Sequence, residues 1–303
     1  MSAEQLHAIL AMGAENPPPA NGGPQDMRDW FEAMMAPTPT ADGIAVVPVT
    51  INGLDCEILH PANLAPDRLV VYVHGGGWLF GSPRSHRVIA SNLARASGCA
   101  VLSVQYRLAP ENPAPAAHDD VFAAYEWALA QGYPDRTLAL VGDSAGGNMA
   151  LATAIRARDA GLPLPAALVL MSPALDLTGQ GASHSEMADA PLVDRGLMGL
   201  FTALYLGDGD PASPAVTPFD ADMTGLPPTL IHVGSWELLR SDSQTLAARM
   251  QAAGVAAELR LWDGMCHNHQ LFAPFLDEGM ESLDQAGVFL RAHLLQDARL
   301  GAQ

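Results

Sequence analysis

Cysteine is scarce in this chain of 303 residues. The three cysteines, Cys56, Cys99 and Cys266, stand at scattered positions, and no two of them form a C-x-x-C pair. An odd number without regular spacing does not predict a disulfide framework. The lack of paired cysteines also argues against a structural zinc site. We therefore expect reduced thiols, as in a cytoplasmic protein.

Basic residues and long apolar runs are also few. The chain has 15 Lys and Arg against 33 Asp and Glu, which gives a formal net charge of -18. An acidic surface repels nucleic acid and anionic lipid, so neither is an expected partner. No uninterrupted apolar run reaches the length of a membrane span, and the N-terminal segment lacks the basic residues of a signal peptide. We expect no membrane association and a cytoplasmic location.

Apolar residues, in contrast, are plentiful. They make up 49% of the chain and charged residues only 16%, a composition that does not favour disorder. The length allows one large α/β domain or two smaller ones. Two short helical patterns, residues 3–12 and 25–35, flank a Pro/Gly-rich stretch at residues 17–24. We assign residues 1–42 to N-terminal cap helices.

From residue 44 the pattern alternates between strands and helices. A hairpin is expected around Asn52-Gly53. Strands are predicted at residues 68–75, 100–108, 136–144, 167–173, 228–235 and 257–264, and helices at 85–97, 116–131, 145–160, 241–254 and 274–295. This alternation predicts an α/β fold with a mostly parallel central sheet and helices on both faces.

The alternation is interrupted once. Residues 183–218 contain an apolar helical pattern at 194–206 that has no strand partner. We predict a cap insertion here, between two parts of one core domain at residues 43–182 and 219–303. Together with the N-terminal helices, this insertion is a candidate lid.

The sharpest local motif is G-x-S-x-G at residues 142–146, with Ser144 at its centre. A predicted strand ends at the motif and a predicted helix begins after it. This context is typical of a nucleophile elbow, a tight turn that presents the serine hydroxyl above the sheet edge. Ser144 is therefore the candidate nucleophile. Asp143 is expected to organise the neighbourhood of the turn.

A second motif, HGGGW at residues 74–78, directly follows a buried strand. Consecutive glycines leave backbone N–H groups free to bind a developing oxyanion. We assign this role to the amides of Gly75, Gly76 and Ala145. His74 is expected to hold the loop by hydrogen bonds.

A serine hydroxyl needs a general base, and the base needs a carboxylate to orient it. In the elbow fold the chain order is serine, acid, histidine. The sequence leaves Glu237 and Asp242 open as the acid. Among the histidines, His267 and His269 share a late loop, whereas His293 is predicted to lie on the last helix.

Taken together, the motifs resemble those of the hormone-sensitive lipase family of bacterial carboxylesterases. They are HGGGW (74–78), YRLAPENPAPAA (106–117), GDSAGGN (142–148), LPPTLIHVG (226–234) and DGMCH (263–267). The resemblance implies His267 as the base and a cap built from the N-terminal helices and an insertion. It also implies Glu237 as the acid, which is a departure because the family's loop typically carries aspartate there; Asp242 remains the alternative.

The resemblance further implies hydrolysis of short- to medium-chain carboxylic esters through an acyl-enzyme, with no cofactor and no metal. Four aromatic residues are candidates for the substrate pocket: Trp78, Phe80, Phe201 and Tyr205. Tyr106, Arg107 and Glu111 are expected to support the loop beneath the site by ion pairing and packing.

Two other functions remain open. The same triad serves hydrolases of amides, carbamates and lactones. Some hormone receptors keep the fold and lose the triad histidine, but His267 is present here. Residues 257–264 are predicted to form the last strand of the sheet, and an exposed edge can pair with a second copy. Related esterases often dimerise in this way, so the resemblance implies a homodimer through this strand.

Overall fold

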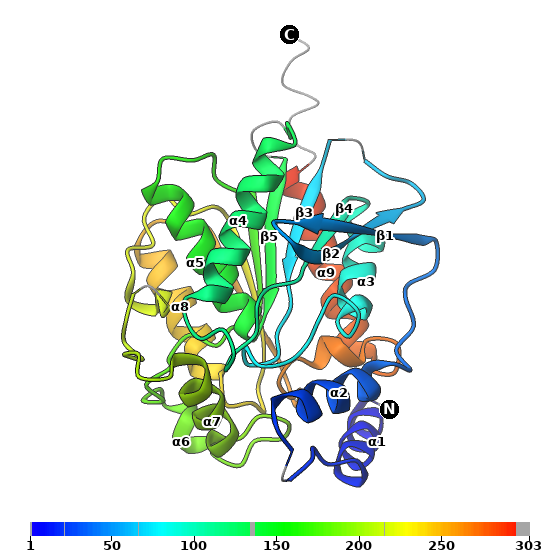
Figure 1. Ribbon diagram of the computed structural model, residues 1–303, viewed down its shortest axis with the longest axis vertical. Helices are drawn as coiled ribbons and strands as arrows, with labels where there is room; N and C mark the ends of the chain where they lie inside the picture. Colours follow the sequence, from blue (N-terminus) through cyan, green and yellow to red (C-terminus); the bar gives the residue numbers. More distant parts are fainter. Residues whose placement is uncertain (1, 21, 66, 134–136, 215, 295–303) are drawn as a thin grey trace.

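The strands follow a different order in the sheet than along the chain. In the computed structural model, which describes residues 2–20, 22–65, 67–133, 137–214 and 216–294, eight strands form one sheet in the order β1-β2-β4-β3-β5-β6-β7-β8 (Figure 1). They are β1 (Ile44–Ile51), β2 (Leu54–Pro61), β3 (Leu69–Val73), β4 (Ala100–Val104), β5 (Leu138–Asp143), β6 (Ala167–Met171), β7 (Thr229–Gly234) and β8 (Ala257–Trp262).

Pairing in the sheet is antiparallel at one side only. The hairpin of β1 and β2 turns at Asn52-Gly53, and β2 runs antiparallel to β4. All the remaining neighbours are parallel. The predicted α/β fold, with its mostly parallel sheet, is confirmed.

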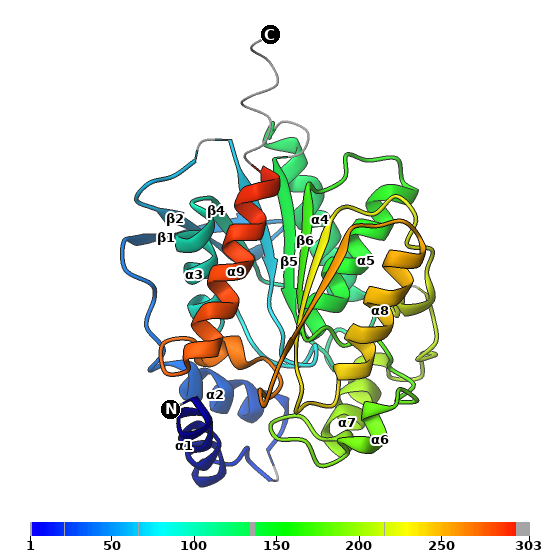
Figure 2. The same ribbon diagram turned by 180° about the vertical axis from the view of Figure 1, so that it is seen from behind.

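Helices cover both faces because the central strands are apolar on both sides. Val70 and Tyr72 of β3 belong to the core layer with α3 (Arg87–Ser97) and α9 (Asp277–Leu294). Val71 and Val73 belong to the layer with α4 (Ala116–Ala130), α5 (Ala145–Asp159) and α8 (Arg240–Ala252). Figure 1 shows α4 and α5 in front of the sheet, and Figure 2, the view from the opposite side, shows α9 in front of it.

The predicted cap segments lie at one end of the sheet. Helices α1 (Ser2–Glu15) and α2 (Pro24–Met35) lie there with α6 (Ser183–Glu186) and α7 (Arg195–Leu206), beside the carboxyl ends of the parallel strands in both views. Two short 3-10 turns, η1 (Pro218–Asp220) and η2 (His269–Phe272), complete the elements. Within the described residues, none of the helices has the length and apolar content to cross a membrane.

Two predicted elements differ from the structure. The strand predicted at 100–108 ends at Val104, because the chain then leaves the sheet and the Tyr106 hydroxyl donates to the carbonyl of His74. The last helix begins at Asp277, after η2 and a short connection. Residues 136 and 295, the predicted limits of a strand and of the last helix, lie outside the described residues.

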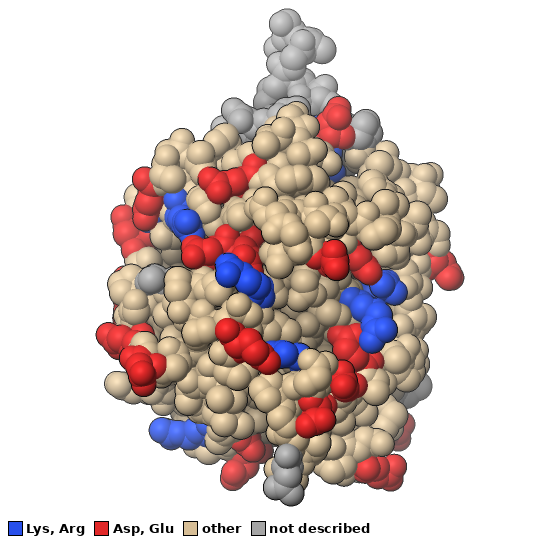
Figure 3. All heavy atoms as spheres, viewed as in Figure 1, with Lys and Arg blue, Asp and Glu red and all other residues tan. Residues whose placement is uncertain are grey.

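Several basic side chains on the surface form ion pairs with acidic side chains. Figure 3 shows acidic side chains spread over the face seen in Figure 1, with basic side chains lying beside them. Pairs such as Arg107–Asp120 and Arg156–Asp119 bring guanidinium and carboxylate groups within 2.8 and 2.7 Å. The expectation that nucleic acid is not a partner stays a prediction.

Candidate active site

Ser144 occupies a strained turn between β5 and α5. Its backbone has φ 52° and ψ -119°, a conformation that costs a non-glycine residue free energy. The flanking glycines allow the turn to close, because a Cβ on Gly142 would collide with the backbone of Gly146, and a Cβ on Gly146 with the carbonyl of Val73. The sharp turn places the serine side chain at the carboxyl end of β5.

His267 lies within reach of that side chain. Its Nε2 atom is 3.0 Å from the Ser144 hydroxyl, and both residues are buried. The histidine comes from the loop between β8 and η2, at the same end of the sheet as the elbow. The structure therefore brings together the two residues that the motifs predict as base and nucleophile.

Glu237 is the carboxylate nearest to the other side of the imidazole. Its Oε2 atom lies 3.8 Å from His267 Nδ1. The same oxygen accepts from the Ser172 hydroxyl at 2.8 Å and from the Gly234 amide at 3.3 Å. Glu237 Oε1 and His267 Nδ1 are both buried, and neither has a hydrogen-bond partner among the residues that the structure describes. A small movement of either side chain would join them.

Asp242 is engaged elsewhere. Its carboxylate accepts from the amides of Leu175 and Asp176 and lies 2.9 Å from His184 Nε2. Burial disfavours the charged form of His184, but the hydrogen bond and charge of Asp242 outweigh this and raise its pKa above the usual 6.5. Asp242 thus anchors α6 to α8 and leaves the position beside His267 to Glu237.

The other two histidine candidates pack against aromatic side chains. His269 is buried, with its ring 5.4 Å from that of Trp262, and burial lowers its pKa to about 3. His293 lies on α9, against Phe289. Among the hydrogen bonds of the described residues, the Ser144 hydroxyl pairs with His267 and with neither of these two.

The HGGG loop corrects one prediction. The amide of Gly75 already donates to Asp143 Oδ1 at 3.1 Å, so it is not free to bind an oxyanion. Within the described chain, the amides of Gly76, Gly77 and Ala145 have no acceptor. Gly76 and Gly77 have φ angles of +107° and +57°, which glycine adopts without the Cβ penalty. The free donors therefore lie one position later in the motif than predicted.

His74 holds this loop in place, as expected. Its Nδ1 atom lies 2.8 Å from the carbonyl of Gly75, and its ring stacks on Tyr106 with centroids 4.2 Å apart. Burial, with a contribution from His86, lowers the pKa of His74 to about 3, so that the ring is neutral near pH 7. His74 therefore supports the glycine loop as an uncharged side chain, by packing and by hydrogen bonding.

The four predicted pocket aromatics divide into two pairs. Trp78 and Tyr205 are fully buried and stack on each other at 4.4 Å, and the Tyr205 hydroxyl lies 2.6 Å from His118 Nδ1. This pair docks α7 against the glycine loop, which corrects its assignment as pocket wall. Phe80 and Phe201 meet edge to face at 5.5 Å, and Phe201 lies against Gly77. Only the second pair borders the free amides.

The N-terminal helix α2 is joined to the residues that follow the glycine loop. Arg28 of α2 donates to the carbonyls of Leu79 and Ala109 and pairs with Glu111. The expected ion pairing of Glu111 is confirmed, but its partner, in the N-terminal segment, was not foreseen. No motif marks Arg28, and 83 positions separate it from Glu111.

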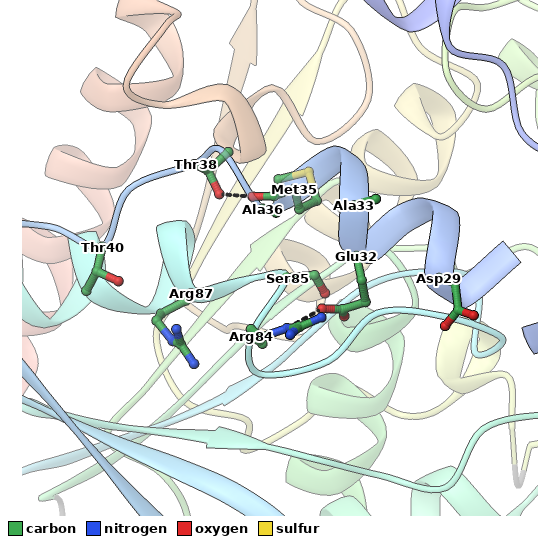
Figure 4. Close-up of a pocket in the computed structure, with 10 residues that line it drawn as sticks. All are labelled: Asp29, Glu32, Ala33, Met35, Ala36, Thr38, Thr40, Arg84, Ser85 and Arg87. Carbon is green, nitrogen blue, oxygen red and sulfur yellow. Dashed lines mark hydrogen bonds and ion pairs between the residues drawn. The ribbon is translucent and has the colours of Figure 1, made fainter. Parts of the chain in front are cut away.

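A surface cavity separates α2 from the segment that follows the glycine loop. It has a volume of about 470 Å³. Figure 4 shows Arg84 directed toward Glu32, with Ser85 beside them. Glu32 also accepts from the Ser82 hydroxyl at 2.5 Å. The cavity does not include Ser144 or His267.

Comparison with known proteins agrees with this geometry. Residues 70–271 match a family model described as alpha/beta hydrolase fold. An acetyl-hydrolase of Streptomyces hygroscopicus is 42% identical over 244 residues, which cover 80% of this chain and 81% of that protein. An esterase of Acinetobacter venetianus is 31% identical over 284 residues, 93% of each chain.

The solved structures that resemble this chain are also esterases. The crystal structure of an esterase from the bacterial hormone-sensitive lipase family superposes with a TM-score of 0.92 and 41% identity, over 96% of this chain and 98% of that one. A mutant of the esterase E40 superposes with a TM-score of 0.93, also at 41% identity, over 97% and 99%. The chain therefore belongs to the α/β-hydrolase fold family and, within it, to the hormone-sensitive lipase group of bacterial esterases.

Proposed function

We propose that this chain is a serine carboxylesterase that hydrolyses short- to medium-chain carboxylic esters through Ser144, His267 and Glu237. The observation that carries the proposal is the 3.0 Å distance between His267 Nε2 and the Ser144 hydroxyl. At this distance the imidazole can take the proton as the hydroxyl attacks an ester carbonyl.

The reaction has two acyl-transfer steps. Ser144 Oγ attacks the carbonyl carbon while His267 accepts its proton; the tetrahedral intermediate then expels the alcohol, which receives that proton from His267. Water attacks the acyl-enzyme in the same way and releases the acid. Glu237 stabilises the imidazolium and its orientation. Every step uses groups of this chain, the ester and water.

The oxyanion is assigned to the amides of Gly76, Gly77 and Ala145. Pre-aimed donors stabilise the negative charge that develops on the carbonyl oxygen, each by about 3 kcal/mol. Ala145 begins α5, so the positive end of the helix dipole adds to its amide.

Two features support a small acyl group. Phe201 lies directly against Gly77, which restricts the space beside the oxyanion loop. The relatives include an acetyl-hydrolase, and a structurally similar esterase, EstE5, was soaked with p-nitrophenyl butyrate. We assign residues 1–42 and 183–218 to a cap over this site, because α1, α2, α6 and α7 lie at the carboxyl ends of the parallel strands (Figure 1).

The test is hydrolysis of p-nitrophenyl esters of increasing acyl length. We expect the highest kcat/KM from acetate to hexanoate, and Ser144→Ala should lower kcat by about 10⁴-fold or more. Retained activity in Ser144→Ala would overturn the proposal. Peptide and lactone substrates in the same panel compare the other leaving groups.

A further inference from the structure

A fully buried carboxylate lies beside the nucleophile and takes no part in the proposed reaction. Asp143 has no solvent-exposed surface. Its Oδ1 accepts from the Tyr72 hydroxyl at 2.6 Å and from the Gly75 amide at 3.1 Å. Its Oδ2 accepts from the Asn268 side chain at 2.7 Å. A buried carboxylate needs such donors, because unpaired charge in the interior is costly.

The donors belong to segments that carry the reacting groups. Gly75 directly precedes the free amide of Gly76, and Asn268 directly follows His267. Asp143 itself directly precedes Ser144. The Asp143 carboxylate therefore contacts Gly75, next to the proposed oxyanion donors, and Asn268, next to the base. Asp143 is also the residue before the nucleophile.

Local backbone geometry shows that these segments need to be held. Asn268 has φ 49° and ψ 41°, and Ser144 has φ 52°; both are left-handed conformations that cost a non-glycine residue free energy. Gly75 is so close to the carboxylate that a Cβ there would collide with Asp143 Oδ2. The contact is thus built into the loop backbone.

We infer that Asp143 is a positioning residue that fixes the glycine loop and the His267 loop relative to Ser144. This inference rests on the proposed esterase function. The carboxylate suits the task since it offers only acceptors to the three donors. Burial raises the pKa of Asp143, and the hydrogen bonds from Tyr72 and Gly75 act in the opposite direction.

The two oxygens of Asp143 allow a selective test. Asp143→Asn keeps an oxygen for Tyr72 and Gly75 but sets an NH₂ group against that of Asn268. This change should misplace His267 and lower kcat for p-nitrophenyl acetate by about 100-fold, with little change in KM. Asn268→Asp should have a similar effect, because it faces two carboxylates toward each other.

Combining the two substitutions restores the hydrogen bond with reversed polarity. We expect Asp143→Asn/Asn268→Asp to recover kcat by about 10-fold or more over Asp143→Asn. If Asp143 has a merely structural role, the substitutions should change Tm, and kcat should not recover in the double variant. Tyr125→Phe is the matched control, because it removes another buried hydrogen bond, to the carbonyl of Pro163, and should lower Tm without changing kcat.

Each result decides between defined alternatives. Wild-type kcat in Asp143→Asn, or a double variant no better than the worse single variant, would overturn the positioning role while leaving the esterase proposal intact. If Asp143→Asn does not fold, Asn268→Ala removes the other partner of the same bond, and unchanged kcat there would equally overturn it. A wild-type protein without esterase activity would overturn both.

Discussion

His267 Nε2 lies 3.0 Å from the hydroxyl of Ser144, although 123 positions separate the two residues along the chain. The parallel sheet explains the encounter. Because β5 and β8 point the same way, the loops after them open at one edge of the sheet. The proposed reaction depends on this edge of the sheet, where the loops that carry Ser144 and His267 meet.

The acid of the triad can be tested by comparing two carboxylates. Glu237→Gln should lower kcat by about 100-fold or more, because the imidazolium formed during attack loses its counter-charge. Asp242→Asn should retain kcat but lower the free energy of unfolding by about 2 kcal/mol, since it disturbs the pairing with His184 and with two amides. The measurements are steady-state kinetics and urea unfolding. The reverse pattern would assign the acid to Asp242.

Acyl-chain preference should depend on Phe201. Its ring lies against Gly77, so Phe201→Ala should open space beside the oxyanion loop. We expect kcat/KM for the octanoate ester to rise relative to the butyrate ester by about 10-fold. Leu200→Ala is the control on the same helix, because Leu200 is 50% exposed. An unchanged ratio in Phe201→Ala would show that the acyl group lies elsewhere.

Acid should destabilise the protein through its buried histidines. Burial lowers the pKa of five of them to about 3 or about 4, namely His74, His86, His118, His232 and His269. In the unfolded chain these five histidines bind protons near pH 6.5, whereas in the folded chain they bind them only near pH 3 to 4. The contribution of these histidines to the free energy of unfolding is therefore fully present above pH 6.5. It is lost as the pH falls, by about 1.4 kcal/mol per pH unit for each such histidine.

Calorimetry measures this linkage directly. Unfolding at pH 6 in buffers of different ionisation enthalpy should reveal uptake of several protons, against almost none at pH 8. Equal proton uptake at the two pH values would mean that these histidines are protonated in the folded protein.

The edge strand β8 is the proposed dimer contact. Leu261 on this strand is 49% exposed, and an unpaired edge can bind a second copy. Light scattering after size exclusion should give a dimer for the wild type and a monomer for Leu261→Lys. Val288→Lys on α9, where the side chain is 54% exposed, should remain dimeric. A monomeric wild type would refute the contact.

Much of the fold and of the site follows from local patterns. The motif around Ser144 predicts a turn between strand and helix because only that context accommodates its glycines and its strain. The chain order predicts that the acid and the base lie in late loops, because parallel strands deliver their loops to one edge, but it leaves two carboxylates and two histidines open. The family resemblance then implies Glu237 and His267. These inferences need sequence spacing but no side-chain positions.

The remaining features depend on contacts between distant segments. The engagement of Gly75 depends on where the Asp143 carboxylate points, and no pattern in the glycine motif encodes that. The pairing of Arg28 with Glu111 depends on how α2 docks. The burial of Trp78 depends on its stack with Tyr205 of α7. Each requires tertiary packing, which periodicity and spacing do not specify.

The most direct measurement is to locate the covalent adduct after reaction with a fluorophosphonate. Peptide mass spectrometry should find the phosphonyl group on Ser144, with labelling abolished in Ser144→Ala and strongly slowed in His267→Gln. Hydrolysis of p-nitrophenyl acetate by a protein whose Ser144 stays unlabelled, or whose label lies on another residue such as Cys266, would contradict the account.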